Sequence, residues 1–384
     1  MIRSVLTATV AAVALAVPAM GQDAVLKSTL YDYRVVKVVD SLINPWGMAF
    51  LPSGDLLVTE RPGRLRIVRA GKLVATPVVG VPTVWVRGQG GLLDIALHPA
   101  FATNRLLYLS FSKPLADGTA STAIVRARFE NDALTDVQEI FLADTKGAGH
   151  FGSRFAFDRN GFLFVTIGDR QVPPTGNLEA HPAQDLSNHH GKIIRIHDDG
   201  KVPADNPFVG RAGAKPEIWS YGHRNSQGLA FNHETGDLWS TEHGPQGGDE
   251  LNLITRGANY GWPVIGFGVN YGPGNTIHSS STHAGMEQPR HVWVPSIGTS
   301  GLMVYTGSKF PLWKGSIFAG GLVGEQLVRL TTEGQVVERA DVLVRKQGRI
   351  RDVRQGPDGF IYLAIDDRQG KPSAIVRLEP VVRR

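Results

Sequence analysis

The chain has 384 residues, of which 40 are basic, 35 acidic and none cysteine, so disulfides, thiolate chemistry and cysteine-ligated zinc are excluded. Its formal charge of +5 is spread along the chain without a dense Lys/Arg block, so nucleic acid is not an expected partner. The 45 glycines and 23 prolines favour many short strands joined by tight turns.

The N-terminus has the pattern of a secretory signal peptide. Arg3 gives a positive start, residues 5–17 are apolar, and Ala19 and Gly21 are small residues at the cleavage-type positions. The apolar run is too short to span a bilayer comfortably, and nothing later in the chain is apolar enough for a transmembrane helix. We expect residues 1–21 to be a removable signal peptide, and residues 22–384 to form one domain that is periplasmic or secreted. The alternative is an uncleaved anchor.

One hairpin pattern recurs through the rest of the chain. Each copy has an apolar run, a polar turn and a second strand, which often closes on Ser or Thr and an acidic residue. The six copies are residues 46–60, 92–111, 154–169, 228–242, 301–321 and 353–366. No amphipathic helix of convincing length appears. Repeated β-units predict an all-β fold, a six-bladed β-propeller; the alternative, a pair of unrelated β-sandwiches, does not require self-similar hairpins.

Two further strand candidates flank the repeats. Residues 33–42 could complete the last blade, and residues 373–380 are expected to pair near the first blade. No linker or change of composition divides the chain between them, which favours a single domain.

Polar, Gly-rich clusters stand at corresponding ends of the hairpins, and a propeller would bring such loops together on one rim. His150 is a candidate general base, because an unperturbed imidazole has a pKa of about 6.5; a structural histidine is the alternative. Arg349 and Arg351 share one face of a strand and could clamp an anionic ligand together with Arg224. The alternative is a pair of solvated arginines.

The acidic turn at residues 242–250 can offer carbonyl and carboxylate oxygens to a hard cation such as calcium. Its alternative is a solvated loop between blades. The histidines lack the ligand spacing of a zinc site. The chain also lacks a Walker loop, a Rossmann fingerprint in a βαβ context and a GxSxG elbow, which argues against ATP, nicotinamide and serine-hydrolase chemistry.

A set of motifs runs through about residues 30–380: NPWGMAFLPSGDLLVTERPGRL, GQGGLLDIALHP, HFGSRFAF, TIGD, GHRNSQGLAF, EHGPQGGDELN, NYGWP and RIRDVRQGPDG. Taken together, these motifs resemble those of the soluble glucose and aldose-sugar dehydrogenases that depend on pyrroloquinoline quinone (PQQ). The resemblance implies a six-bladed propeller that oxidises the anomeric CH–OH of an aldose to the lactone, with hydride transfer to the quinone.

The resemblance also implies roles for single residues. His150 would remove the proton from the sugar hydroxyl, Gln89 would contact both quinone and sugar, and Asp169 would bind the sugar. The expected cofactor-binding residues besides Gln89 are Arg224, Asn225, Arg349 and Arg351. The expected calcium ligands are Gly244 and Pro245 beside the cofactor, and Glu250 and Tyr260 at a further structural site.

Two positions depart from the family's pattern. Gly149 replaces the acidic residue that stands before the catalytic histidine in glucose-type members, and Val323 stands where many members have a lysine. The competing hypotheses are a calcium-dependent lactone hydrolase, for which these loops lack a carboxylate-lined central calcium site, and a non-catalytic propeller that acts as a binding module. The electron acceptor is not identified by the sequence.

The signal-peptide hypothesis predicts a mature N-terminus near Gln22. N-terminal sequencing of the protein from the periplasmic fraction should find residues 1–21 removed. A mature protein that begins at Met1 would contradict this prediction.

Overall fold

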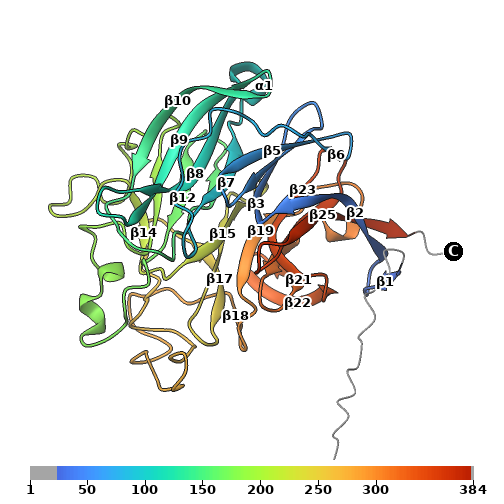
Figure 1. Ribbon diagram of the computed structural model, residues 1–384. Coiled ribbons are helices and arrows are strands. Elements are labelled where there is room, and N and C mark those ends of the chain that lie inside the picture. Colours follow the sequence, from blue (N-terminus) through green and yellow to red (C-terminus); the bar gives the residue numbers. More distant parts are fainter. Residues whose placement is uncertain (1–23, 382–384) are drawn as a thin grey trace, which may run out of the picture.

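The computed structural model describes residues 24–381, so the predicted signal peptide lies outside the described residues. The described chain forms six antiparallel sheets that follow one another around a centre, which confirms the predicted all-β, six-bladed propeller (Figure 1). Helical structure in this part of the chain is limited to α1 (Phe101–Asn104) and 3-10 turns at Leu178–Ala180, Pro182–Gln184 and Pro311–Trp313. No helix within residues 24–381 is long and apolar enough to cross a membrane.

Each predicted hairpin forms the two inner strands of one blade. The first strands of the blades contact one another around the centre. The six hairpins are β3 (Pro45–Phe50) with β4 (Leu56–Glu60), β7 (Leu92–Leu97) with β8 (Leu106–Pro114), β11 (Phe155–Phe157) with β12 (Leu163–Ile167), β15 (Ser226–Phe231) with β16 (Leu238–Glu242), β19 (Thr299–Val304) with β20 (Ile317–Gly321), and β23 (Arg349–Gln355) with β24 (Ile361–Asp366).

Two further strands extend each of the first five blades outward. In chain order they are β5 (Arg64–Arg69) and β6 (Lys72–Leu73), β9 (Ala120–Glu130) and β10 (Ala133–Leu142), β13 (Lys192–Ile196) and β14 (Ile218–Tyr221), β17 (Asp249–Ile254) and β18 (His291–Trp293), and β21 (Gln326–Glu333) and β22 (Val336–Arg345). Every neighbouring pair within these sheets is antiparallel, as hairpin connections require.

The last blade combines both ends of the described chain. The N-terminal strand β2 (Asp32–Ile43) pairs with the C-terminal strand β25 (Pro372–Val381), and β1 (Leu26–Lys27) adds to the edge (Figure 1). The prediction that residues 33–42 complete the last blade is therefore confirmed. The strand at residues 373–380 also exists, but it pairs with β2 and β24 rather than with the first blade. Its Ile375 shares an apolar core with Met48 of that blade.

The recurrent Ser or Thr of the hairpin pattern joins neighbouring blades. In each of the first four blades, a hydroxyl on the second strand donates to a main-chain carbonyl at or just before the first strand of the next blade. The donor and acceptor pairs are Thr59 with Leu93, Ser110 with Ser153, Thr166 with Ser226, and Thr241 with Ser300. The repeat therefore encodes not only each hairpin but also the contact between blades.

Buried charges meet near the centre. Arg154 lies directly before β11 and is only 1% exposed, and its Nη1 is 3.2 Å from Asp94 Oδ1 and 3.0 Å from Asp352 Oδ1. Arg354 contacts the same two carboxylates at 3.1 and 3.0 Å. Two arginines thus balance two fully buried aspartates, which is the condition under which buried charge is tolerated.

The same Arg154 also connects the ion cluster to the main chain of other blades. Its Nε donates to the carbonyl of Gln227 at 2.7 Å, and its Nη2 donates to the carbonyl of Arg351 at 2.8 Å. Asp352 in turn accepts the main-chain N–H of Met48 at 3.0 Å. The cluster therefore joins strands of several blades at one point.

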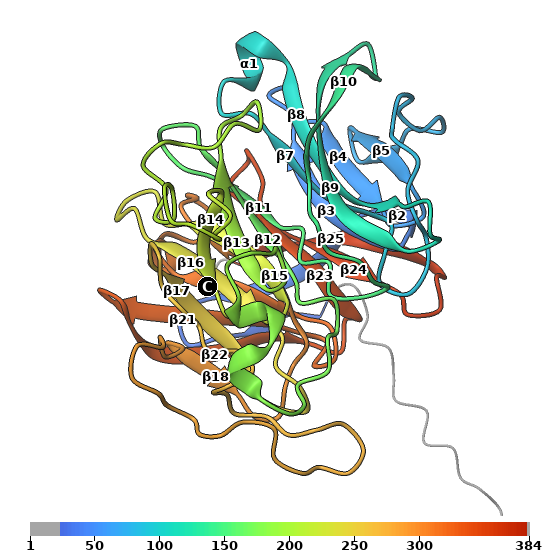
Figure 2. The ribbon, with the colours of Figure 1, turned by 90° about the vertical axis from the view of Figure 1, so that its left-hand side faces the viewer.

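Two long connections carry little regular structure and lie on the periphery of the sheets (Figure 2). They are residues 168–191, between β12 and β13, and residues 255–290, between β17 and β18. Gln184 of the first connection donates to the carbonyl of Trp262 in the second at 2.7 Å, and its amide also pairs with Asn259. The two connections therefore support each other beside one end of blades three and four.

Replacing Arg154 should destabilise the whole propeller. Arg154→Met leaves two buried aspartates with one arginine, and removing one partner of a buried ion pair costs about 3–5 kcal/mol. Urea unfolding measures this loss. Lys113→Ala, which removes a half-exposed ion pair with Glu139, should change the free energy of unfolding by about 1 kcal/mol or less. Equal effects of the two substitutions would contradict the prediction.

Candidate functional site

A cavity of about 550 Å³ opens where the inner strands of several blades end. Its volume is in the range of small-molecule sites. The predicted site residues that line it are Gln89, Asn225, Arg349 and Arg351. These residues come from widely separated parts of the chain, so the propeller brings them together as the sequence predicted.

The two arginines of β23 give the central cavity a cationic wall. Both contact Asp366 Oδ2, Arg349 at 3.6 Å and Arg351 at 3.4 Å, so one carboxylate faces two guanidinium groups. The Nε atoms of both arginines are buried without a hydrogen-bond partner. Burial lowers the pKa of Arg351 to about 10, which still leaves it charged at neutral pH. Buried donors with excess positive charge suit a polyanionic ligand.

Two more cations line the same cavity, and the sequence analysis gave neither a role. Arg61 donates from Nη1 to the carbonyl of Gly88 at 2.9 Å, and Arg368 is exposed at the edge. Val323 also lines the cavity and is 71% exposed. Four arginines therefore surround the cavity, although position 323 carries no lysine. Arg61 lies in the quoted motif NPWGMAFLPSGDLLVTERPGRL, directly after the hairpin of residues 46–60, and that position was the available signal.

His150 lies next to the cavity, in the loop before β11, and only 5% of it is exposed. Its main-chain N–H donates to Gln89 Oε1 at 2.8 Å, so the side chain of Gln89 fixes the backbone of His150. Its ring Nδ1 lies 2.6 Å from Asp169 Oδ1. With Nδ1–H directed at a carboxylate, the lone pair of the neutral imidazole is on Nε2.

Asp169 is 1% exposed, and protein donors occupy both of its oxygens. Oδ1 also accepts the main-chain N–H of Gln171 at 2.9 Å, and Oδ2 accepts Trp262 Nε1 at 2.8 Å. These contacts place Asp169 behind His150, where it orients the ring; contact with a sugar stays a prediction. Trp262 belongs to the quoted motif NYGWP, but sequence reasoning gave it no role because its partner lies in another connection.

The environment keeps His150 neutral. Burial lowers the pKa of His150, Arg224 and Arg170 lower it further, and Asp169 only partly opposes them. Burial by itself would raise the pKa of the Asp169 carboxyl, but His150 and Arg224 hold it below its usual range. At pH 7 the pair is therefore a neutral imidazole beside a carboxylate, which is the state in which histidine accepts a proton.

The predicted calcium ligands gather around a different, much smaller cavity of about 20 Å³. The residues around it include Gly244, Pro245, Glu250 and Tyr260, and also Arg224. Arg224 does not line the central cavity. Its Nη1 donates to the carbonyl of Gly244 at 2.8 Å, and its guanidinium lies 5.2 Å from the Trp262 ring centroid. Calcium at the Gly244 carbonyl would have to share that oxygen with Arg224.

Glu242 and Glu250 lie around this small cavity, and a bound cation would offset the repulsion between their carboxylates. Burial and the nearby Glu242 raise the pKa of Glu250 to about 8. The hydroxyl of Tyr260 donates to the Leu253 carbonyl and accepts from the N–H of Thr255. Only the main-chain carbonyl oxygen of Tyr260 is therefore free to bind a metal. Within residues 24–381 no three His, Asp or Glu side chains form a metal cluster. A cation here would combine Glu250 with carbonyl oxygens, which are donors that calcium accepts.

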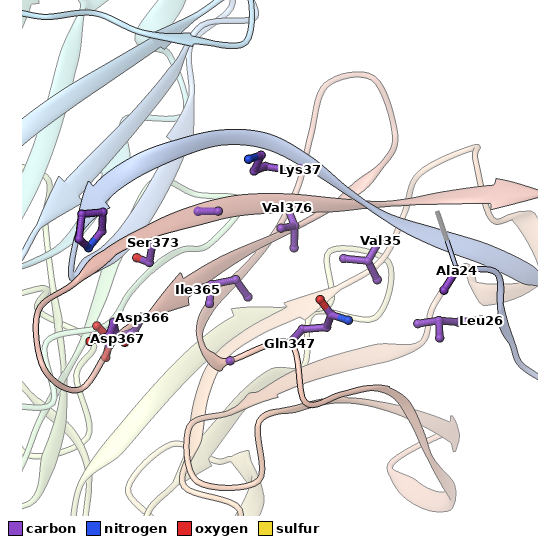
Figure 3. A pocket seen from close by; sticks show the side chains of 13 residues that line it. Ala24, Leu26, Val35, Lys37, Gln347, Ile365, Asp366, Asp367, Ser373 and Val376 are labelled. Carbon is purple, nitrogen blue, oxygen red and sulfur yellow. The ribbon is translucent and has the colours of Figure 1, made fainter. Parts of the chain in front are cut away.

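Another cavity, of about 360 Å³, lies along β2, β24 and β25 in the last blade (Figure 3). Leu26 and Val35 line one side, and Asp366 and Asp367 stand at the end that borders the central cavity (Figure 3). None of the predicted catalytic, cofactor-binding or calcium-binding residues lines it. The central cavity, with His150 beside it, is therefore the candidate functional site.

The known protein families, proteins and solved structures that are similar to this chain include sugar dehydrogenases. The family described as Glucose / Sorbosone dehydrogenase matches residues 42–377. Aldose sugar dehydrogenase YliI of Escherichia coli is 42% identical over 86% of this chain and 90% of its own length. The crystal structure of the E. coli soluble aldose sugar dehydrogenase in the apo-form has a TM-score of 0.84, with 39% identity over 91% of this chain and 100% of that one. The PQQ-bound aldose sugar dehydrogenase of Streptomyces coelicolor has a TM-score of 0.74, with 30% identity over 90% and 98%.

Removing the carboxylate behind His150 should shift its titration. In Asp169→Asn the pKa of His150 should fall further, by about one to three units, because an opposite charge within contact distance is lost. NMR titration of the imidazole ring protons measures the shift. The signal of His98, which lies near Asp198 instead, serves as control. An unchanged His150 titration would show that Asp169 does not act on this ring.

Proposed function

Because this chain belongs to the glucose/sorbosone dehydrogenase family, we propose that it is a PQQ-dependent aldose dehydrogenase that oxidises the anomeric CH–OH of a sugar to the lactone. The observation that carries the proposal is the neutral His150–Asp169 pair beside a cavity with buried, partly unpaired arginines. The names of an aldose sugar dehydrogenase and of a PQQ-bound neighbour support the substrate class and the cofactor.

In this proposal, His150 binds the anomeric hydroxyl through Nε2 and takes its proton. Asp169 stabilises the imidazolium that forms, since its carboxylate already accepts Nδ1–H at 2.6 Å. Trp262 keeps the other carboxylate oxygen of Asp169 occupied. When bound, the quinone would supply the hydride acceptor, and calcium would supply Lewis acidity.

The remaining predicted residues would hold the cofactor and its metal. Arg349 and Arg351 face the central cavity and would bind carboxylates, and Gln89 and Asn225 line the same space. Arg224 would act from the neighbouring small cavity, with calcium at the carbonyls of Gly244 and Pro245 and a further calcium at Glu250 and Tyr260. The protein would work in the periplasm or outside the cell and pass electrons to an acceptor that the sequence does not identify.

Reconstitution tests the proposed function directly. Protein stripped with chelator is mixed with PQQ, calcium or both, and reduction of a dye by aldoses is followed. Dye reduction that requires both additions supports the proposal. Lactone hydrolysis with calcium alone would favour the lactone hydrolase, and inactivity towards both reactions would favour a binding module.

Removing the base should slow the chemical step. His150→Ala should lower turnover by about 10²–10⁴-fold, the usual contribution of general base catalysis. The wild-type rate should rise with pH as His150 loses its proton and level off above its lowered pKa. Single-turnover kinetics of cofactor-saturated protein measures both effects. A variant rate within a few fold of wild type would exclude His150 as the base.

Removing an arginine of the central cavity should weaken cofactor binding. Arg351→Ala should raise the Kd for PQQ at least about tenfold, because a charge-assisted hydrogen bond contributes about 1.5–3 kcal/mol. Fluorescence titration of the stripped protein with PQQ and calcium measures Kd. Arg339→Ala, at a half-exposed arginine paired with Asp341, is the control. Equal Kd values for the two variants would remove Arg351 from the cofactor site.

A further inference from the structure

Asn44 joins the end of strand β2 to the lining of the central cavity, and only 8% of it is exposed. Its Nδ2 donates to Asp366 Oδ1 at 2.8 Å and to the carbonyl of Asp367 at 2.6 Å, so both N–H groups of the amide are used. The main-chain carbonyl of Asn44 accepts the N–H of Arg61 at 3.0 Å. Asn44 is therefore fixed between the first and the last blade.

The backbone at position 44 needs a residue that tolerates the left-handed region. Its φ is 45°, and asparagine adopts this conformation more readily than most residues because its short amide can form local hydrogen bonds. Glycine would accept the same backbone but would bring no amide. The conformation alone therefore does not require asparagine, and the contacts of the amide have to explain it.

The hydrogen bond from Asn44 sets the direction of the Asp366 carboxylate. Because the Asn44 amide holds Oδ1, the oxygen that faces the arginines is Oδ2, which lies 3.4 Å from Arg351 and 3.6 Å from Arg349. Both distances exceed the roughly 2.7–2.9 Å of a close charge-assisted hydrogen bond. Asp366 therefore stands between the two guanidinium groups without closing on either, and the Nε atoms of both arginines stay unpaired.

The neighbouring carboxylate does not compete for these arginines. Asp367 also lines the central cavity, but its Oδ1 accepts the N–H groups of Gln369 at 2.8 Å and Lys371 at 3.0 Å. These main-chain donors lower the pKa of Asp367 and hold its side chain in the turn after β24. Asp366 is therefore the carboxylate that can neutralise an arginine of β23.

We propose that Asn44 is a positioning residue for the anionic ligand: its amide holds the Asp366 carboxylate away from the arginine pair of β23 and so keeps both guanidinium groups available. This inference rests on the proposed function, in which the two arginines bind cofactor carboxylates. Without the amide, the Asp366 carboxylate can turn towards one arginine and close the gap to hydrogen-bond distance. That arginine is then neutralised, and an incoming carboxylate has to displace Asp366 from it.

A double-mutant cycle tests the inference with wild type, Asn44→Gly, Asp366→Asn and the double variant. Asn44→Gly keeps the left-handed backbone and removes the amide, and Asp366→Asn removes the negative charge. Asn131→Gly is a matched control, because Asn131 also has a left-handed backbone, with a φ of 50°, but lies exposed in the turn between β9 and β10. Fluorescence titration of the stripped protein with PQQ and calcium gives Kd, and thermal unfolding gives Tm.

Asn44→Gly should raise the Kd for PQQ about threefold to tenfold, the effect of one hydrogen bond, whereas Asn131→Gly should leave it unchanged. Asp366→Asn should bind PQQ at least as tightly as wild type, because it leaves both arginines without a counter-ion. In the Asp366→Asn background, Asn44→Gly should change Kd by less than about twofold, since no carboxylate remains to be positioned. A purely structural role of Asn44 would instead weaken binding in both backgrounds alike.

Two results would overturn the inference while the proposed function stands. One is an Asn44→Gly variant whose Kd equals that of Asn131→Gly, and the other is an equal loss of affinity in both backgrounds. If Asn44→Gly does not fold, Asp366→Asn alone decides: equal or tighter binding of PQQ supports the inference, and weaker binding overturns it. If wild type does not bind PQQ at all, the proposed function fails and the inference fails with it.

Discussion

The buried contact of Arg154 with Asp94 and Asp352 is the constraint on which the centre of the propeller depends. The three side chains stand on or beside the inner strands of different blades, and none has more than 1% of its surface exposed. Charges so buried are tolerated only at contact distance, so the ion cluster sets the spacing of these strands. Arg154 also donates to the carbonyl of Arg351. The same cluster therefore fixes the backbone position of Arg351, whose side chain lines the central cavity.

The candidate functional site combines two different electrostatic environments. The cavity wall carries arginines in excess over acidic groups, whereas His150 is held neutral by burial and by neighbouring cations. A cationic wall favours a polyanion, and a neutral imidazole favours proton abstraction. The arginines and His150 stand on different strands and loops. The cationic wall and the neutral imidazole can therefore lie a short distance apart.

The sequence predicted what is local and missed what depends on the meeting of distant loops. The hairpins were predictable because period-two alternation and turn residues are contained within each repeat. The lining of the cavity by Arg349 and Arg351 followed from the resemblance and from their spacing on one strand. The bond from Trp262 to Asp169 joins two long connections that carry no periodic pattern, and the place of Arg224 at the smaller cavity depends on the carbonyl of Gly244.

The pairing of β2 with β25 has a consequence for how the chain reaches its native state. Asn44, just after β2, donates to the carbonyl of Asp367, which lies 323 positions later in the chain. A ring that is closed by its own two ends cannot close while the C-terminus is still being synthesised. Contacts of such long sequence separation also make folding slow. The last blade can therefore form only after β25 has been synthesised, and the propeller stays open until then.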